Sequence, residues 1–429
     1  MFMVLKSSWA LLLGIGMLML GNGLQGSLLG VRGSAAGFSA FEMSIVMSAY
    51  FLGFLFASRV TPGMIRRVGH VRVFAALGSL ISAVLILYPA VQHPIAWALG
   101  RVLIGFCFCG VYVTAESWLN HSATNETRGQ ALSLYMIVQT GGIILAQALL
   151  LVPDKSGFLL FVIPSVLVSI SFAPILLSIS PTPAFETTKP MRLKQLFLSS
   201  PLGCVGMFLL GGVFSAQFGM SAVFGTMAGL NLAEISLFVS MFYIGALLLQ
   251  YPLGWISDRM DRRRLITLVA GAGGLAAVAA LLFGQFYAVL LASAFVIGGM
   301  SNPLYSLLIA HTNDFLEVED MAAASAGLLF INGTGAITGP LIIGWMMQAT
   351  APSAFFGLIA FLMLSLTGYA LYRATQRAAP AVDETASYAP ILASASPVAL
   401  EVAQEYAIET AQEAESDENA ESRHKPAAE

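Results

Sequence analysis

Apolar segments of about 20 residues, separated by short polar loops, follow one another from residue 9 to residue 372. A helix needs roughly 20 mostly apolar residues to cross a bilayer, and lipid accepts only backbone that satisfies its own hydrogen bonds. The pattern therefore predicts an all-α polytopic membrane protein with twelve transmembrane helices. The expected spans are 9–30, 41–61, 72–90, 95–118, 129–151, 157–178, 201–224, 234–256, 265–284, 287–310, 321–347 and 353–372.

The second half of this pattern repeats the first. A shift of 192 residues lays segment 41–72 on segment 233–264 without a gap, with seven identities that include Gly53 with Gly245. Six predicted helices separate the copies, and because six is even, both copies cross the membrane in the same direction. The sequence thus predicts two parallel six-helix repeats. They give an N-terminal bundle (1–179), a cytoplasmic linker (180–200) with a short surface helix near 191–198, a C-terminal bundle (201–373), and an acidic tail (374–429) that we expect to be disordered.

Composition agrees with a membrane protein and disfavours other classes. Hydrophobic residues make up 57% of the 429 residues and charged residues 10%, whereas soluble domains contain about 45–50% apolar and about 25% charged residues. We expect no nucleic-acid partner, and the missing phosphate-binding pattern G-x-x-x-x-G-K-[ST] disfavours an ATP-driven pump. The three cysteines, Cys107, Cys109 and Cys204, lie in predicted spans and imply no disulfide framework and no metal site, so no cofactor is expected.

Positive charge is distributed unequally between the two sets of loops. Of the 17 Lys and Arg residues before residue 374, 14 fall on one side of the predicted membrane, Arg32 and Lys155 fall on the other, and Arg101 lies within a span. Loops that are rich in Lys and Arg stay in the cytoplasm. We therefore predict a multi-pass protein of the cytoplasmic (inner) membrane with both termini in the cytoplasm.

The most densely charged loop lies between the eighth and ninth predicted helices, where 258–264 hold six charges in seven residues. Its spacing resembles the signature loop of the major facilitator superfamily, G-x-x-x-D-R-x-G-R-R/K, with Asp261 in place of the second Gly. An ordinary positive anchor would explain the arginines but neither the Gly nor the first Asp. The matching positions are Gly254, Asp258, Arg259, Arg262 and Arg263.

A variant of the same loop stands between the second and third predicted helices. Pro62 takes the place of the first Gly and Arg66 that of the Asp, while Arg67, Gly69 and Arg72 keep the register. The resemblance to the superfamily covers roughly residues 9–372. Further patterns are most similar to the bacterial YcaD-like branch: Ala115-Glu116-Ser117-Trp118, Arg128-Gly129, Leu304-Tyr305, and the segment from Asn332 to Pro340.

The resemblance implies that charged loops at the cytoplasmic helix ends form a gate. The loop before the eleventh helix holds four acids and neither Lys nor Arg, which is more than the dipole of one helix N-terminus requires. We predict that Arg66 and Arg67 face these acids, and Asp258 faces Arg128, when the cytoplasmic side is closed; a generic charged surface is the alternative. The gate and signature-loop candidates are Arg66, Arg67, Gly69, Arg72, Glu116, Arg128, Gly254, Asp258, Arg259, Arg262, Arg263, Asp314, Glu317, Glu319 and Asp320.

Arg101 lies inside the fourth predicted span, where a charge costs roughly 2.5–3.5 kcal/mol on insertion scales and normally faces a cavity or a partner. With Gly105 it resembles the facilitator pattern R-x-x-x-G. Binding an anion, tuning a proton site and snorkelling to the headgroups remain open. The fold implies a cavity lined by the first, fourth, seventh and tenth helices. Its polar candidates, each of which could instead join two helices, are Asn22, Gln25, Arg101, Tyr112, Gln139, Gln217, Asn302, Tyr305 and Asn332.

Small residues on the eleventh predicted helix form the pattern Gly335-x-x-x-Gly339-Pro340-x-x-x-Gly344. Small faces let helices approach closely, and proline allows a kink. The pattern resembles an antiporter motif of the fifth helix but stands on the eleventh, which weakens an antiporter assignment.

Together these features predict a secondary active transporter, not an enzyme, that moves a small organic solute by alternating access as a monomer in the bilayer. The centres of the spans hold no Asp or Glu, so proton coupling stays open, with Glu116, Asp258 and His311 as candidates. One alternative is a non-transporting sensor or scaffold of the same fold. Another is a membrane-embedded lipid-modifying enzyme, which would need clustered carboxylates or histidines that the sequence does not show.

Overall fold

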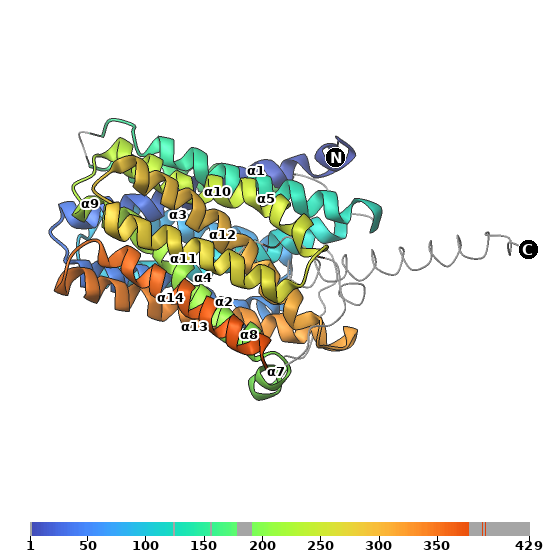
Figure 1. The fold of residues 1–429 in the computed structure, drawn as a ribbon. Helices are drawn as coiled ribbons and strands as arrows, with labels where there is room; N and C mark the ends of the chain where they lie inside the picture. Colours follow the sequence, from blue (N-terminus) through green and yellow to red (C-terminus); the bar gives the residue numbers. More distant parts are fainter. Residues whose placement is uncertain are drawn as a thin grey trace, which may run out of the picture.

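The computed structural model of the chain describes residues 2–122, 125–154, 157–177 and 191–376 together with Tyr388 and Ile391, and it is helical throughout its ordered elements (Figure 1). The N-terminal half comprises α1 (Phe2–Ala35), α2 (Ala40–Val68), α3 (His70–Ala90), α4 (Pro94–Ser122), α5 (Asn125–Leu149) and α6 (Leu159–Leu177). After a short helix α7 (Leu193–Ser199), the C-terminal half comprises α8 (Pro201–Ser215), the π-helix η1 (Ala216–Met220), α9 (Ser221–Met227), α10 (Leu232–Ser257), α11 (Arg262–Phe283), α12 (Tyr287–Asn313), α13 (Val318–Ala349) and α14 (Ala354–Ala374).

Twelve helical spans are found where the apolar pattern predicts them. Within the described residues, eleven segments are long and apolar enough to cross a membrane, one of them being the continuous α8–η1–α9, and the shorter apolar α6 supplies the twelfth. Most helices extend beyond the predicted span at one end or both, because the apolar pattern marks only the hydrocarbon core; α6 does not. Helix α7 stands where the surface helix was expected. The rest of the predicted linker, and all of the tail after residue 376 except Tyr388 and Ile391, lie outside the described residues.

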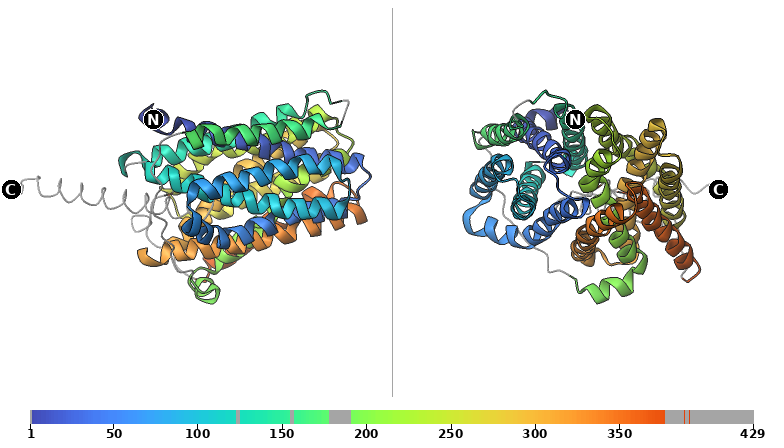
Figure 2. Two further views of the ribbon diagram at one scale, coloured as in Figure 1. Left: turned by 180° about the vertical axis from the view of Figure 1, so that it is seen from behind. Right: turned by 90° about the vertical axis from the view of Figure 1, so that its left-hand side faces the viewer.

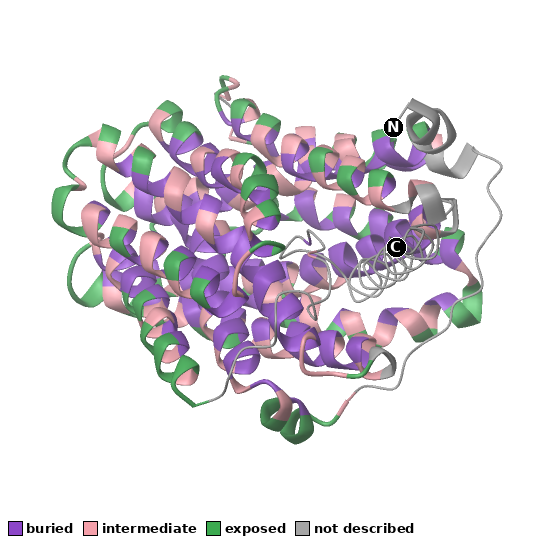
Figure 3. Cartoon of the chain, turned by 45° about the vertical axis from the view of Figure 1, so that its right-hand side comes forward, coloured by how far each residue is buried: buried purple, intermediate pink, exposed green. Residues whose placement is uncertain are grey.

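The helices pack in two groups. In the N-terminal half, α1 packs on α5 and α6, α2 packs on α4, and α3 packs on α4 and α6. In the C-terminal half, α8 packs on α13 and α14, α10 packs on α12, and α11 packs on α12 and α14. The end-on view in Figure 2 shows the two groups side by side, and Figure 3 shows buried residues concentrated where helices face one another.

The two halves repeat the same close helix crossing. A Cβ added to Gly53 on α2 would lie 1.9 Å from the carbonyl oxygen of Val102 on α4. At the position 192 residues later, a Cβ on Gly245 of α10 would lie 2.0 Å from the carbonyl oxygen of Phe295 on α12. Both crossings therefore require glycine, because only a residue without Cβ lets the backbones touch. The predicted parallel repeat is thus present in three dimensions.

Matched caps begin the corresponding helices. Ser39 and Glu42 form a capping box at the start of α2, in which each side chain accepts from the other residue's backbone N–H. Asn231 and Glu234, again 192 residues later, form the same box at the start of α10. A capping box satisfies two N–H groups that have no partner within the helix. These two carboxylates therefore serve helix initiation.

We expect the substitution Gly53→Ala to lower the stability of the protein. The added methyl group would overlap a backbone oxygen that cannot rotate away, and overpacking of this kind costs about 1–3 kcal/mol or more. The matched control is Gly63→Ala on the same helix, where a Cβ meets no atom within 4 Å. Thermal unfolding of the purified protein should show a lower melting temperature for the first variant alone; equal melting temperatures would contradict the close crossing.

The two halves meet mainly at one end of the bundle. The backbone N–H of Phe41, at the start of α2, donates to the side chain of Gln348, at the end of α13, at 3.2 Å. The Ser236 hydroxyl on α10 donates to the carbonyl of Gln147 on α5 at 2.7 Å. Both contacts lie at the end away from the loops α2–α3, α10–α11 and α12–α13. We call the end with those loops the charged-loop end and the other the sealed end.

Candidate functional site

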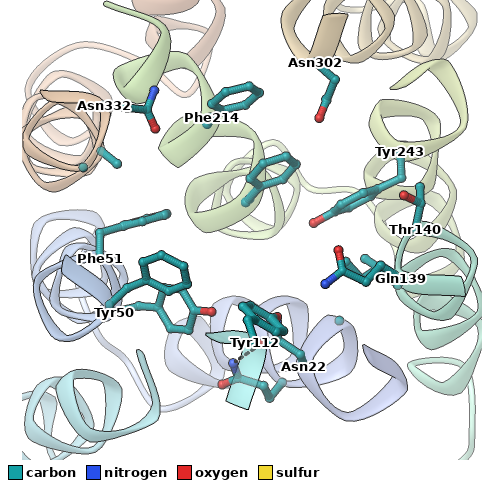
Figure 4. Close-up of a pocket in the computed structure, with 18 of the residues that line it drawn as sticks. Asn22, Tyr50, Phe51, Tyr112, Gln139, Thr140, Phe214, Tyr243, Asn302 and Asn332 are labelled. Carbon is teal, nitrogen blue, oxygen red and sulfur yellow. Dashed lines mark hydrogen bonds between the residues drawn. The ribbon is translucent and has the colours of Figure 1, made fainter. Parts of the chain in front are cut away.

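A central cavity lies between the two halves and encloses or opens onto about 1350 Å³ of empty space. Residues of α1, α2, α4 and α5 line it from the N-terminal half, and residues of α8, η1, α10, α12 and α13 line it from the C-terminal half. Figure 4 shows side chains from both halves projecting into it. Because the halves are in contact at the sealed end, the cavity is closed in that direction.

Most of the predicted polar candidates come together in this cavity. The helices bring to one cavity groups that are as much as 310 residues apart in the sequence, from residue 22 to residue 332. Their roles toward a substrate stay predictions. The candidates that line the cavity are Asn22, Gln25, Arg101, Tyr112, Gln139, Asn302 and Asn332.

Two predicted cavity residues do not line it. Gln217 is buried in η1 and exchanges hydrogen bonds with Ser301 of α12, donating at 3.0 Å and accepting at 3.2 Å. Tyr305 is fully buried behind Phe214, with ring centroids 5.9 Å apart. Gln25 and Gln217 occupy matching positions in the repeat, 192 residues apart. Gln217 stands in the π-helix and joins two helices, whereas Gln25 lines the cavity.

Aromatic residues form much of the cavity wall, and the sequence reasoning missed them. Tyr50, Phe51 and Phe54 come from α2, Phe214 from α8, Phe218 from η1, and Tyr243 from α10. Aromatic stripes in a membrane helix commonly pack against other helices or face lipid, so the presence of these residues in the sequence does not by itself mark a cavity. The available signal was the helical spacing of Tyr50 and Phe54, which puts both side chains on one face.

Arg101 sits at the head of a chain of hydrogen bonds on the N-terminal wall. It is 3% exposed, and its Nη1 donates to Oε1 of Gln25 at 3.0 Å. Gln25 Nε2 then donates to Asn22 Oδ1 at 3.1 Å, and Asn22 Nδ2 donates to the Tyr112 hydroxyl at 2.9 Å. The guanidinium also lies 4.7 Å from the centre of the Tyr50 ring. A cation over a ring face at this distance is favourable.

Glu116, a predicted gate residue, connects to the cavity through two side chains. It is 2% exposed and accepts a hydrogen bond from the Tyr135 hydroxyl at 2.9 Å. That hydroxyl in turn accepts from Nε2 of Gln139, which lines the cavity, at 2.8 Å. A buried carboxylate is thereby linked by hydrogen bonds to the central space.

The charged loops pair within the C-terminal half in this conformation. Arg262 forms a buried ion pair with Asp314, and its Nη2 lies 3.9 Å from Asp258. Arg66, Arg67, Arg72 and Glu317 are exposed. The side chains of Arg128 and Glu319 lie outside the described residues, so the expected pairs that involve them stay predictions.

The glycines of the α13 motif lie against two different neighbours. A Cβ on Gly335 would lie 2.0 Å from the carbonyl oxygen of Phe208, and one on Gly339 would lie 2.9 Å from Cα of Gly212, both in α8. A Cβ on Gly344 would lie 2.3 Å from Cβ of Ser44 on α2. The motif, with Pro340 inside the helix, therefore brings α13 close to its own half and to the opposite half.

No metal site is found among the described residues, in which no group of three or more His, Cys, Asp or Glu side chains could hold an ion. Cys107, Cys109 and Cys204 are buried free thiols.

Comparison with known proteins places this architecture in a family. The family model described as Major Facilitator Superfamily matches residues 11–233 and 204–408. The uncharacterized MFS-type transporter YcaD of Salmonella paratyphi A is 24% identical over 364 residues, which cover 84% of this chain and 94% of YcaD. YcaD of Salmonella typhi is 25% identical over 355 residues, covering 82% and 91%.

Solved transporter structures share the fold. A variant of the nucleoside transporter NupG superposes with a TM-score of 0.67 at 17% identity, covering 84% of this chain and 99% of NupG. A bacterial homologue of the human lysosomal transporter Spinster, in an inward-facing and unoccupied conformation, gives 0.66 at 13%, covering 95% and 98%. The fucose:proton symporter FucP of E. coli gives 0.56 at 16%, covering 85% and 98%. With two matches of the family model that together span most of the chain, and relatives of the YcaD-like branch, this chain belongs to the major facilitator superfamily.

Proposed function

We propose that the chain is a secondary active transporter that moves a small organic solute across the cytoplasmic membrane by alternating access. The observation that carries this proposal is the polar and aromatic cavity between two six-helix halves, which meet mainly at one end. A cavity of this kind can be exposed to either side in turn if the halves rock about it. The curated relatives are named as transporters, which agrees with this reading.

The charge distribution supports one orientation. The charged-loop end carries the excess of Lys and Arg, and the positive-inside rule assigns such an end to the cytoplasm. In this orientation both termini are cytoplasmic, and the cavity in this conformation is closed toward the outside. We take residues 1–179 and 201–373 as the two rocking bundles, joined by the linker 180–200.

Proton coupling is best supported at Glu116. Its carboxylate is buried, and the Tyr135 hydroxyl and the Gln139 amide connect it to the cavity at 2.9 and 2.8 Å. An ionisable side chain buried in a membrane bundle is costly and commonly marks a proton or substrate pathway. Protonation of Glu116 would alter the hydrogen bonds at Gln139, so substrate binding and proton binding could influence each other.

Uptake into proteoliposomes tests both parts of this proposal. A panel of radiolabelled small solutes is offered with and without an imposed pH gradient, and liposomes without protein are the control. We expect uptake of at least one solute class that the pH gradient accelerates, and we expect Glu116→Gln to remove the acceleration while leaving exchange in place. Exchange that keeps its full pH dependence in Glu116→Gln would exclude this residue, and no uptake of any solute would favour the sensor or scaffold alternative.

A further inference from the structure

We propose that the cavity binds an organic anion whose charged group pairs with Arg101. This inference rests on the proposed transport function and adds the chemical class of the substrate. Among the described residues that line the cavity, Arg101 is the only Arg, Lys, His, Asp or Glu. The central site therefore carries one net positive charge.

The charge of Arg101 has no carboxylate to balance it. The Arg101 guanidinium donates to the Gln25 amide oxygen and to the Met47 sulfur, the latter at 3.6 Å, and lies over the Tyr50 ring. Within the described residues its Nε is buried and has no hydrogen-bond partner. A guanidinium has five N–H donors, of which two are used here, so three stay available. A buried charge without a partner is strongly unfavourable, and an anionic ligand would supply that partner.

Arg101 also fixes the polarity of its neighbours. Because a guanidinium can only donate, Oε1 of Gln25 must accept, and Nε2 of Gln25 must be the donor to Asn22. The same reasoning makes Asn22 Nδ2 the donor to Tyr112. Each of these two amide oxygens thereby accepts one hydrogen bond, and the Gln25 and Asn22 amide nitrogens each keep one N–H that this chain of hydrogen bonds does not use. N–H donors beside a cation are complementary to carboxylate or phosphate oxygens.

The fold does not require an arginine at this position. Gly105 of α4 and Gly298 of α12 make equivalent close contacts, since a Cβ on either would lie 2.0 Å from a carbonyl oxygen of the neighbouring helix. Gly105 and Gly298 are 193 residues apart, and the same offset aligns Arg101 with Ala294, which is fully buried. The C-terminal half forms the same helix crossing with the methyl group of Ala294, so helix packing does not explain why Arg101 is charged.

The rest of the cavity is complementary to a ligand whose remaining part is apolar and carries a hydrogen-bond donor. Phe51, Phe214, Phe218 and other rings supply apolar wall area. Opposite the Arg101 wall, Asn302 and Asn332 each donate to a backbone carbonyl through Nδ2, which leaves their oxygens as acceptors. Figure 4 shows Asn302 projecting toward the cavity from the C-terminal side. The substrate class is therefore an organic anion with an apolar middle.

Ligand-induced thermal stabilisation of the purified full chain tests this inference with probes matched in shape. The probes are benzoate, phenyl phosphate, benzamide and benzylamine, with hexanoate, hexanamide and hexylamine as an aliphatic series. We expect an anion in at least one series to raise the melting temperature while its neutral and cationic partners do not. Benzoate against phenyl phosphate distinguishes the two anion chemistries. In Arg101→Gln the apparent affinity for the anion should fall roughly tenfold or more, because a charged hydrogen bond is lost.

The matched control is Arg192→Gln, which removes an exposed arginine outside the cavity and should leave anion binding unchanged. Without ligand, we expect Arg101→Gln to melt at the same or a higher temperature than the parent, since it removes an uncompensated charge. A clear loss of stability without ligand would assign Arg101 a structural role and overturn the inference. Binding or uptake of the neutral or cationic probes in preference to the anions would also overturn it while leaving the transport function intact.

A second observation concerns the two described tail residues, Tyr388 and Ile391, which are in contact with the C-terminal half. The Tyr388 backbone N–H donates to Asp258 at 2.9 Å, and its hydroxyl accepts from Gln250 at 3.0 Å. The backbone N–H of Ile391 donates to the Ser306 hydroxyl at 2.9 Å, and that hydroxyl donates to the Ile391 carbonyl at 3.1 Å. Ile391 is 4% exposed.

These contacts lie on the path between the cavity and the charged-loop end. Gln250 is four residues after Ala246 on α10, and Ser306 is four residues after Asn302 on α12; Ala246 and Asn302 both line the cavity. Residues four apart share a helix face, so the tail residues lie one turn beyond the cavity on its own side. The Tyr388 ring also fills the space beside Gly254, where an added Cβ would lie 2.6 Å from it. We infer that Tyr388 and Ile391 restrict the opening of the cavity.

Cysteine labelling measures that restriction without a known substrate. In a background with the three native cysteines replaced, Ala246→Cys reports access of a membrane-impermeant maleimide from the charged-loop end. Adding Tyr388→Ala and Ile391→Ala should accelerate labelling several-fold. Tyr372→Ala, at an exposed tyrosine of α14, is the control and should not. An unchanged or slower labelling rate in the double variant would overturn the inference.

Discussion

Oxidation of the double variant Gly30→Cys/Ala222→Cys should abolish transport, and reduction should restore it. Gly30 lies on α1 and Ala222 on α9, so a disulfide would join the two halves at the sealed end. A Cβ on Gly30 lies 2.9 Å from Cβ of Ala222, slightly closer than the roughly 3.5–4.5 Å between Cβ atoms of a disulfide. If the halves must separate here to expose the cavity to the other side, the cross-link stops every cycle. Proteoliposome exchange before and after copper-phenanthroline, and again after dithiothreitol, measures this.

A cross-link of similar geometry within one half is the control. Gly225 on α9 and Ile235 on α10 both belong to the C-terminal half, and a Cβ on Gly225 lies 3.7 Å from Cβ of Ile235. The variant Gly225→Cys/Ile235→Cys should form its disulfide and keep transporting, because it constrains no motion between halves. Full transport by the oxidised Gly30/Ala222 variant would show that the sealed end does not open.

The second large effect is expected at the buried ion pair of the signature loop. Arg262 and Asp314 have side chains that are 2% and 3% exposed, and they connect the start of α11 to the end of α12. Removing one partner of a buried pair costs about 3–5 kcal/mol where no other group compensates the remaining charge. Asp258 lies 3.9 Å from Arg262, so we expect part of that cost. We therefore expect Asp314→Asn to lower the melting temperature clearly, and the apolar pair Arg262→Met/Asp314→Leu to recover most of the loss.

An exposed pair in the same loop provides the comparison. Arg264 lies 4.0 Å from Asp261, and its side chain is 81% exposed. Exposed pairs contribute about 0–1 kcal/mol. Arg264→Gln removes this exposed pair and leaves the contact between Asp261 and the buried Arg263 in place, so it should melt close to the parent. Equal melting temperatures for Asp314→Asn and Arg264→Gln would contradict a stabilising role for the buried pair.

The repeat and the spans could be predicted because membrane insertion depends on composition and length alone. Gly53 and Gly245 align in the sequence and make the same contact in space, and the capping residues of α2 and α10 follow the same offset. Arg101 was found because a charge inside a span is costly wherever it points. These features depend on local chemistry, which a sequence states directly.

The remaining features depend on which face of each helix lines the cavity. Apolar patterning does not reveal that face, because the lipid-facing side of the helix is apolar and the cavity wall is largely aromatic as well. Tyr50 and Tyr243 therefore went unrecognised, although both line the cavity. Gln217 was misplaced because a π-helix rotates the residues around it, and no periodicity signals that change. That Arg66 and Arg67 face Asp314 when the cytoplasmic side is closed stays a prediction. In this conformation Asp314 forms a buried ion pair with Arg262, a contact that only the three-dimensional arrangement decides.

The distance between the two halves at the charged-loop end tests the central claim, that the halves rock about the cavity. Spin labels at Val71 on α3 and Tyr372 on α14, which are 41% and 56% exposed, report this distance by pulsed electron resonance in nanodiscs. We predict two distance populations. In a background with the native cysteines replaced, the pair Gly30→Cys/Ala222→Cys is added and oxidised before the spin labels are attached. This cross-link should leave only the longer distance. A single distance that the cross-link does not change would contradict alternating access.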